Sequence, residues 1–255
     1  MPLVSDFYEY IDSIAPFSGQ MEWDNSGLLT GDENAAVERV CLALDITPET
    51  VRKAAEMEAD LFISHHPVIF KPLKNVMKGN CVYELIQNDI AAICAHTSLD
   101  CARDGVNDVL IDIFNIQKAE MIPTKAADDL VRAGLLPQSM SASSLARLVR
   151  EELNAKVRYV DGGKVIETAA VCGGSGGDLY ADIAEAGIDA LITGDVSYHD
   201  FLGAKQAGVT LIAAGHFQTE NPVVEYLADK LRARFPQTDI IVLGEDDPIE
   251  HISID

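Results

Sequence analysis

The chain has 255 residues and a formal net charge of −22, from 19 lysines and arginines against 41 aspartates and glutamates. Nucleic-acid-binding proteins present basic surfaces that replace phosphate counterions, so this composition argues against direct nucleic-acid binding. No segment has the roughly 18 consecutive apolar residues of a membrane-spanning helix, so no membrane partner is expected. The five cysteines are odd in number and form no CxxC pair, which predicts free thiols and a cytoplasmic location.

Residues 1–16 lack the basic and apolar regions of a signal peptide and predict a helix instead. Ser5 is the expected N-cap, Phe7 and Ile11 fall on one helical face, and Pro16 ends the segment.

Short apolar strands then alternate with amphipathic helices. Thr47 as N-cap and Pro48 in the first turn mark one helix start. The predicted strands are 39–45, 60–64, 90–95 and 117–122, and the predicted helices are 47–59, 79–89 and 104–114. Such alternation predicts parallel pairing with helices covering the sheet.

The second half repeats the alternation after a mixed segment, 123–140, which predicts a linker and an extra strand over 128–135. The predicted helices are 141–153, 178–187, 199–208 and 223–235, and the predicted strands are 168–174, 188–194, 209–215 and 239–244.

The two halves also resemble each other residue by residue. Residues 59–64 parallel 188–193, and 91–96 parallel 210–216 with one extra residue. Each copy then has an acid four residues after a histidine, as in His96…Asp100 and His216…Glu220. This self-similarity predicts an internal duplication.

We therefore expect an α/β fold with two similar α/β lobes, mostly parallel strands covered by helices, and a dinuclear metal site between the lobes. The expected lobes are 1–125 and 126–255, with 221–255 a candidate to pack on the first lobe.

Histidines and acids follow the carboxyl ends of the predicted strands, where α/β proteins bind ligands. Of the six histidines, His65, His66, His96 and His216 occupy such positions, whereas His251 carries no argument. A single histidine of this kind is more often a core or capping residue. Burying four imidazoles and two carboxylates together without a metal would leave costly unpaired groups, so the clusters favour a metal site.

Six ordered motifs resemble the Nif-three-like family, whose bacterial members are called GTP cyclohydrolase 1 type 2 homologs. The resemblance spans nearly the whole chain and fits the short form, without an inserted domain. The motifs are residues 23–28, 64–70, 96–100, 173–176, 194–200 and 215–220.

The resemblance implies the metal ligands one by one. His66 and Asp100 match one site, His65 and His216 match the second, and Glu220 matches the ligand shared by both. Zinc, iron, manganese, nickel and cobalt all accept this ligand set.

Two further histidines are candidate catalytic residues. His96 matches a family position beside the metals, which implies an outer-sphere or proton-transfer role. His199 matches the motif at 194–200, although a helix-start role is equally consistent. Phe217 stands where the family usually has tyrosine, which removes one hydroxyl donor.

Two segments suggest phosphate binding without establishing it. Lys71 and Lys74 follow the His-His-Pro turn, but exposed loop lysines are more often only solvated. The glycines of 173–177 could cradle a phosphate, but they match neither common phosphate-loop spacing, so a tight turn is favoured.

Three functions remain open. The first is a metal-dependent hydrolase in which activated water attacks a nucleotide-like substrate, as the family name implies for GTP. The alternatives are a phosphoesterase and a non-catalytic metal-binding or interaction protein. The resemblance also implies a homo-oligomer in the form of a hexameric ring.

Overall fold

The computed structural model describes residues 1–250, and His251 lies outside the described residues. The chain forms two compact units. Unit 1 comprises residues 1–10, 23–96 and 227 onward, and unit 2 comprises 11–22 and 97–226. The sequence predicted a single boundary after residue 125, whereas the chain contributes several segments to each unit. One physical reason is β11 (Asp239–Val242), which pairs in parallel with β2 (Arg39–Ala43) of unit 1.

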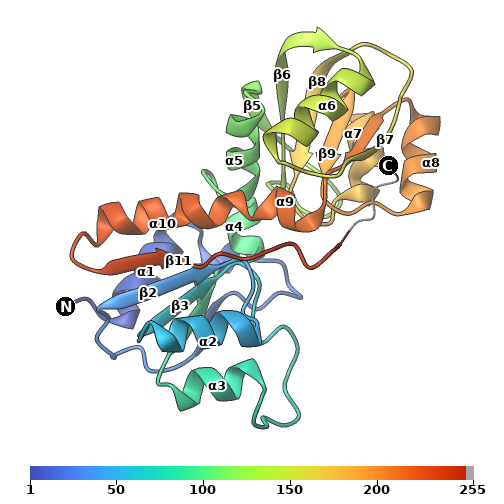
Figure 1. The fold of residues 1–255 in the computed structure, drawn as a ribbon. Helices are drawn as coiled ribbons and strands as arrows, with labels where there is room; N and C mark the ends of the chain where they lie inside the picture. Colours follow the sequence, from blue (N-terminus) through green and yellow to red (C-terminus); the bar gives the residue numbers. More distant parts are fainter. Residues whose placement is uncertain (251–255) are drawn as a thin grey trace. The chain divides into compact units, whose positions relative to one another are not determined.

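Unit 1 contains a five-stranded sheet in the order β1-β4-β3-β2-β11. Its remaining strands are β1 (Gly27–Thr30), β3 (Leu61–Ser64) and β4 (Ala91–Cys94). Strands β2, β3 and β11 of this sheet are labelled in Figure 1. The pairs β2–β3 and β3–β4 are parallel, as predicted, while β1 runs antiparallel to β4. The loops after β3 and β4 therefore leave the same edge of the sheet, and these loops carry His65, His66 and His96.

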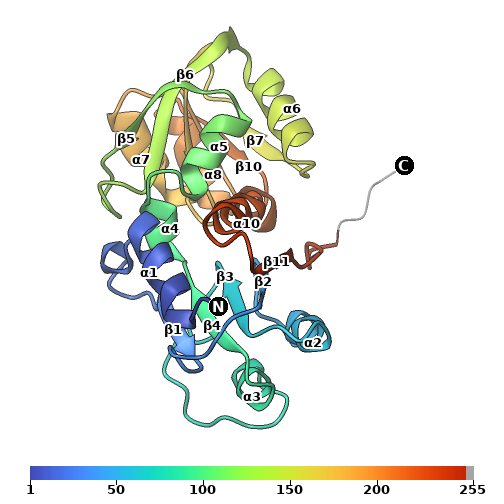
Figure 2. The ribbon, with the colours of Figure 1, turned by 90° about the vertical axis from the view of Figure 1, so that its left-hand side faces the viewer.

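Helices cover both faces of the first sheet. Helices α2 (Pro48–Glu56) and α3 (Cys81–Gln87) pack on one face, where Val51, Leu85 and Phe62 are buried together. Helix α1 (Val4–Ile14) begins in unit 1 and lies on the side opposite α2 (Figure 2).

Of the two N-caps predicted from the sequence, Thr47 is confirmed and Ser5 is not. Thr47 caps α2 and forms a reciprocal capping box with Thr50. Ser141 accepts the N–H of Ser144 at the start of α6 (Ala142–Glu152). Ser5, however, lies inside α1 and does not cap it, since the helix already begins at Val4.

Unit 2 contains a six-stranded sheet in the order β5-β6-β8-β9-β10-β7. The strands are β5 (Gln117–Ile122), β6 (Val131–Met140), β7 (Arg158–Val160), β8 (Ile166–Cys172), β9 (Ala190–Thr193) and β10 (Thr210–Ala213). Only the pairs β8–β9 and β9–β10 are parallel. The prediction of mostly parallel strands is wrong for this sheet, because β5, β6 and β7 add antiparallel pairings.

Alternate residues of β8 serve two hydrophobic cores. Ala169 and Val171 pack with α6 and with α5 (Val106–Ile113), while Ala170 and Cys172 pack with α7 (Tyr180–Glu185) and α8 (Tyr198–Ala207). This two-residue period is that of a strand buried on both faces.

The helix after each third parallel strand is short and was not predicted. Helix α4 (Thr97–Cys101) follows β4, and α9 (His216–Glu220) follows β10. Both contain only five residues, which is too few to show helical periodicity in the sequence. Helix α10 (Pro222–Arg234) follows α9. Among the described residues, no helix is long and apolar enough to cross a membrane.

Asp189 is expected to stabilise the first residues of β8 in unit 2. Its carboxylate accepts the N–H groups of Glu167 and Thr168, at 3.0 and 3.1 Å, and pairs with Lys164 at 3.1 Å. Burial acts to raise the pKa of Asp189, but these hydrogen bonds outweigh it and lower the pKa below 3.8. The charged carboxylate therefore stabilises the folded state above pH 3.8, and this contribution is lost as the pH falls through the lowered pKa.

We expect Asp189→Asn to reduce the free energy of unfolding by about 1–3 kcal/mol at pH 7. The deficit should shrink as the pH falls below 3.8. Urea unfolding followed by circular dichroism measures both values. Glu185→Ala, at an exposed position on α7, is the control and should change stability by less than about 0.5 kcal/mol. An equal deficit at all pH values would contradict the proposed role of the charge.

Candidate metal site

Three imidazoles of unit 1 lie together at the carboxyl edge of its sheet. The ring centroids of His65 and His96 are 5.2 Å apart, and those of His66 and His96 are 5.5 Å apart. One nitrogen from each of the three rings lies within 4.8 Å of the others, as in groups that hold a metal ion. The strand ends thus bring together the three histidines of unit 1 that the sequence singled out.

Each of these rings is held through its Nδ1 atom. His65 Nδ1 lies 2.9 Å from the Ala95 carbonyl oxygen, and His66 Nδ1 lies 2.9 Å from Asp45 Oδ1. His96 Nδ1 lies 2.7 Å from Asp24 Oδ1, whose side chain is fully buried. An oxygen at Nδ1 favours the tautomer with the proton there, which makes Nε2 the nitrogen that can bind a metal.

Two hydrogen bonds fix the turn after β3. The His66 N–H donates to the Leu44 carbonyl at 2.9 Å, and the Ser64 hydroxyl donates to the His66 carbonyl at 2.7 Å. These bonds hold two adjacent histidines with their ring centroids 5.0 Å apart.

Unit 2 gathers the remaining predicted ligands around Glu220. His216 Nε2 lies 3.0 Å from Glu220 Oε2, and a carboxylate oxygen of Asp100 lies within 4.8 Å of one of Glu220. His216 Nδ1 lies 2.8 Å from Asp195 Oδ2, which repeats the arrangement of His66 and His96. Asp100 and Glu220 are buried, so their charges suit a bound cation.

The glycine-rich segment after β8 packs directly on this group. Gly174 has φ of +63°, and a Cβ atom there would lie 2.1 Å from Glu220 Oε1. The Gly174 N–H donates to Thr219 Oγ1 at 3.0 Å. This geometry fits the tight turn that the sequence favoured, and it explains why a larger residue would displace Glu220.

Asn107 joins three parts of unit 2 behind the carboxylates. Its side chain is fully buried, donates to the Asp100 and Leu130 carbonyls, and accepts the Gly173 N–H at 2.8 Å. This role could not be predicted from the sequence, because a single asparagine in a helix carries no spacing pattern.

His199 belongs to neither donor group among the described residues. It is exposed in the first turn of α8, with its ring 5.5 Å from that of Tyr198, and it joins none of the metal-ligand groups among residues 1–250. Its proposed catalytic role stays a prediction.

The cysteines form no disulfide among the described residues, and four of the five are buried. Burial, followed by the charges of Asp100 and Glu220, raises the pKa of Cys172. Burial also raises the pKa of Cys41 to about 11 and that of Cys101 to about 12. These thiols are therefore protonated at neutral pH, which makes them poor metal ligands and poor nucleophiles.

We expect Cys81, which is only partly buried, to be the one cysteine that iodoacetamide alkylates quickly in the native protein at pH 8. Peptide mass spectrometry after timed quenching measures each site. In urea all five should react. Fast native alkylation of Cys172 would contradict its burial beside Glu220.

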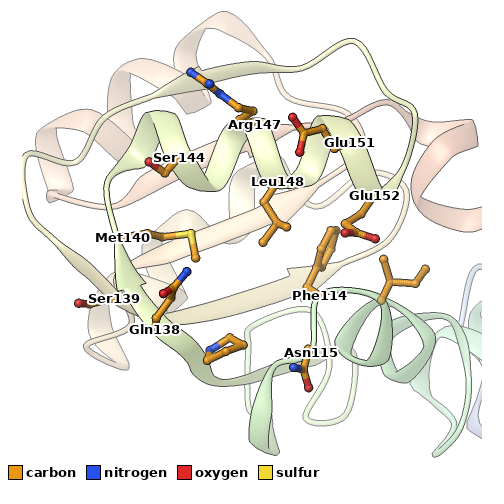
Figure 3. Close-up of a pocket in the computed structure, with 12 residues that line it drawn as sticks. Phe114, Asn115, Gln138, Ser139, Met140, Ser144, Arg147, Leu148, Glu151 and Glu152 are labelled. Carbon is orange, nitrogen blue, oxygen red and sulfur yellow. The ribbon is translucent and has the colours of Figure 1, made fainter.

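A separate hollow of about 690 Å³ opens in unit 2 between the end of α5, β6 and α6 (Figure 3). Apolar side chains such as Phe114 and Leu148 line it together with Arg147 and Glu151. It contains none of the predicted site residues.

The fold and the site define a class: an α/β protein with two sheets and clustered histidine and carboxylate side chains that could bind a metal ion. The sequence profile described as Duf34/NIF3 (NGG1p interacting factor 3) matches residues 2–248, so the chain belongs to that family. This confirms the resemblance seen in the sequence motifs.

Individual relatives agree with this assignment. A Clostridium perfringens protein named GTP cyclohydrolase 1 type 2 homolog is 32% identical, over 98% of this chain and 99% of its own length. A Clostridium acetobutylicum protein of the same name is 35% identical over 89% of each chain. Among solved structures, a Staphylococcus aureus protein matches with a TM-score of 0.90 and 27% identity, over 98% of this chain and 99% of that one.

Proposed function

We propose that this protein is a metal-dependent hydrolase that holds two divalent ions and acts on a nucleotide-like substrate. The observation that carries the proposal is the set of four strand-end imidazoles, each with an oxygen at Nδ1 that leaves Nε2 to bind a metal ion or, in His96, to transfer a proton. Such outer partners are typical of metal-binding histidines, and a purely structural histidine does not need them.

We assign the ligands as the family resemblance implies. His66 and Asp100 would hold one ion, His65 and His216 would hold the other, and Glu220 would serve both. The donors of each unit fit this assignment, since buried Asp100 and Glu220 add two negative charges to a set of neutral imidazoles. Imidazole and carboxylate ligands suit zinc, iron, manganese, nickel or cobalt.

Bound divalent ions supply Lewis acidity, which polarises an electrophile and activates water for hydrolysis. The chain supplies the proton transfers. His96 suits this task because Asp24 fixes its Nδ1 and leaves Nε2 to accept or donate a proton. His199 is a second candidate, although its exposed position gives it no fixed partner in the site.

The names of the clostridial relatives point to a cyclohydrolase reaction on a guanine nucleotide. In that reaction water adds to C8 of the guanine and the imidazole ring opens. Phosphoester hydrolysis would use the same donors.

We also propose that the two units arose by duplication. The order helix, antiparallel strand, and three parallel strands with intervening helices occurs twice, from α1 to β4 and from α6 to β10. An aspartate accepts two backbone N–H groups at the start of a strand in both units. Asp60 accepts those of Glu38 and Arg39, and Asp189 accepts those of Glu167 and Thr168.

We propose a cytoplasmic homo-oligomer, and by family resemblance a hexameric ring. The five cysteines without a disulfide support a reducing compartment. Light scattering that gives the mass of a monomer would refute the oligomer.

The test of function is a substrate screen of metal-loaded protein. Elemental analysis first gives metal per chain, and GTP, other nucleotides and generic phosphoesters are then tested beside metal-stripped protein and the His65→Ala variant. We expect turnover of a nucleotide that needs both metal and His65. Turnover that survives stripping and substitution would overturn the proposal, and full metal content without turnover would favour a binding protein.

A further inference from the structure

The loop after the two adjacent histidines has a composition unlike the rest of the chain. Residues 67–80 contain Lys71, Lys74 and Lys78 and no acid, in a chain whose net charge is −22. None of the ion pairs found among residues 1–250 involves these lysines. The loop is therefore a local positive region that directly follows His65 and His66 in the chain.

Two large aromatic side chains lie exposed beside the same histidines. Trp23 is 60% exposed and Phe70 is 44% exposed. Aromatic side chains of this size usually contribute to stability by being buried, so their exposure needs another explanation. Their ring centroids are 5.8 Å apart, and both lie near the His96 ring, at 6.0 and 6.2 Å. Exposed aromatic surface gathered at one point marks a binding site more often than a folding element.

The position of Trp23 is fixed by the segment that also holds His96. The next residue, Asp24, binds His96 Nδ1, and Ser26 Oγ accepts the His96 N–H at 3.1 Å. Asn25 Nδ2 donates to the Ile69 carbonyl at 2.6 Å, which ties this segment to the residue before Phe70. The aromatic pair and the histidine are thus held by one hydrogen-bonded frame.

We propose that Trp23 and Phe70 form a stacking subsite for the heteroaromatic ring of a nucleotide, and that Lys71 and Lys74 bind its phosphates. The proposal rests on the proposed function, because it names the residues that select the substrate of the histidine centre. A ring stacked on Trp23 would lie beside His96, the residue assigned to proton transfer. Basic residues on the same loop give the tail of an anionic ligand a favourable place on an otherwise acidic protein.

Trp23 is the only tryptophan in the chain, so its fluorescence reports on this subsite directly. Metal-stripped protein is titrated with GDP, with guanosine as the ring alone, and with tripolyphosphate as the phosphates alone. We expect saturable quenching by GDP and weaker saturable quenching by guanosine. Because the readout needs no turnover, it separates this subsite from the activity of the metal centre.

Two sets of variants test the binding of the ring and the binding of the phosphates separately. The double variant Lys71→Ala/Lys74→Ala should weaken GDP binding roughly tenfold and leave guanosine binding unchanged. The matched control, Lys156→Ala/Lys205→Ala, removes the same charge from exposed positions in unit 2 and should change neither. Trp23→Leu, followed by calorimetry, should weaken GDP binding roughly 5- to 150-fold, and Trp23→Phe should restore part of the loss.

The outcomes also separate the two proposals. Saturable GDP quenching in His65→Ala protein that binds no metal and turns over no substrate would support the subsite even if the hydrolase proposal fails. Turnover without any quenching would overturn the subsite alone. A blue shift of Trp23 emission with vesicles of phosphatidylcholine and phosphatidylserine, with no response to GDP or guanosine, would also overturn it, since the loop would then be a membrane-docking surface.

Discussion

Replacing Glu220 by glutamine is expected to weaken metal binding by more than about 100-fold, a loss above that seen for outer partners of metal ligands. The proposed assignment makes Glu220 the ligand of both ions, so its neutral amide would impair both sites at once. Glu220 is also buried beside His216, with Glu220 Oε2 3.0 Å from His216 Nε2. The substitution keeps the size of the side chain, removes its charge and replaces one carboxylate oxygen with an amide nitrogen. Elemental analysis after dialysis against a weak chelator measures the loss.

The control for this prediction is Glu225→Gln. Glu225 is exposed on α10, so its variant should keep the metal content of the wild type. Thermal unfolding of both variants shows whether either has lost its fold. A folded Glu220→Gln protein with full metal content would contradict the assignment of Glu220 as a shared ligand.

A second variant tests the position of Glu220 without changing any proposed ligand. In Gly174→Ala the added methyl group would lie 2.1 Å from Glu220 Oε1, closer than two such atoms can approach. Either Glu220 or the loop must move, so metal affinity should fall although every proposed ligand is present. Equal loss in both variants would indicate that the position of Glu220 matters as well as its charge.

Much of the fold could be predicted because its elements carry local signals. Apolar strands of four to seven residues and capped helices account for α2, α6 and the parallel strands of both sheets. The antiparallel strand β7 was missed because it has three residues, of which two are exposed, so it has no hydrophobic pattern. The sequence made 221–255 a candidate to pack on the first lobe, but it could not predict all the segments of each unit, since these depend on contacts such as the pairing of β11 with β2, about 200 residues away.

The candidate ligands could be named because strand ends bring side chains to a common edge. Their outer partners could not be named, because aspartates are frequent in this chain and only the folded structure shows which of them meets a histidine. Asp45 could have been proposed as a partner, because it follows the strand β2 in the same way that His96 follows β4. Asp24 lies in the motif at 23–28, but nothing in that motif pointed to His96, because the contact joins positions 72 residues apart.

Arg132 shows how the interior of unit 2 supports the same site. Its side chain is 2% exposed, although it carries a full charge. Its guanidinium pairs with Asp108 at 3.1 Å and donates to the carbonyls of Cys101 and Ala102, at 3.0 and 2.9 Å, and to that of Asp129. Cys101 ends the short helix that carries Asp100 and Ala102 follows it, so Arg132 fixes the end of the element that presents a proposed ligand.

We expect Arg132→Met to lower the free energy of unfolding by about 3–5 kcal/mol, because it leaves a carboxylate and three carbonyls without their donor. Adding Asp108→Leu should recover part of this loss, since the unpaired charge is then removed as well. Urea unfolding followed by circular dichroism measures each variant, and Arg147→Met, at an exposed position on α6, should cost less than about 0.5 kcal/mol. The folded Arg132→Met protein should also bind metal more weakly, because α4 has lost the contacts that fix its end. Unchanged stability would mean that the buried guanidinium does not hold this part of unit 2 together, and unchanged metal affinity would mean that Asp100 keeps its place without it.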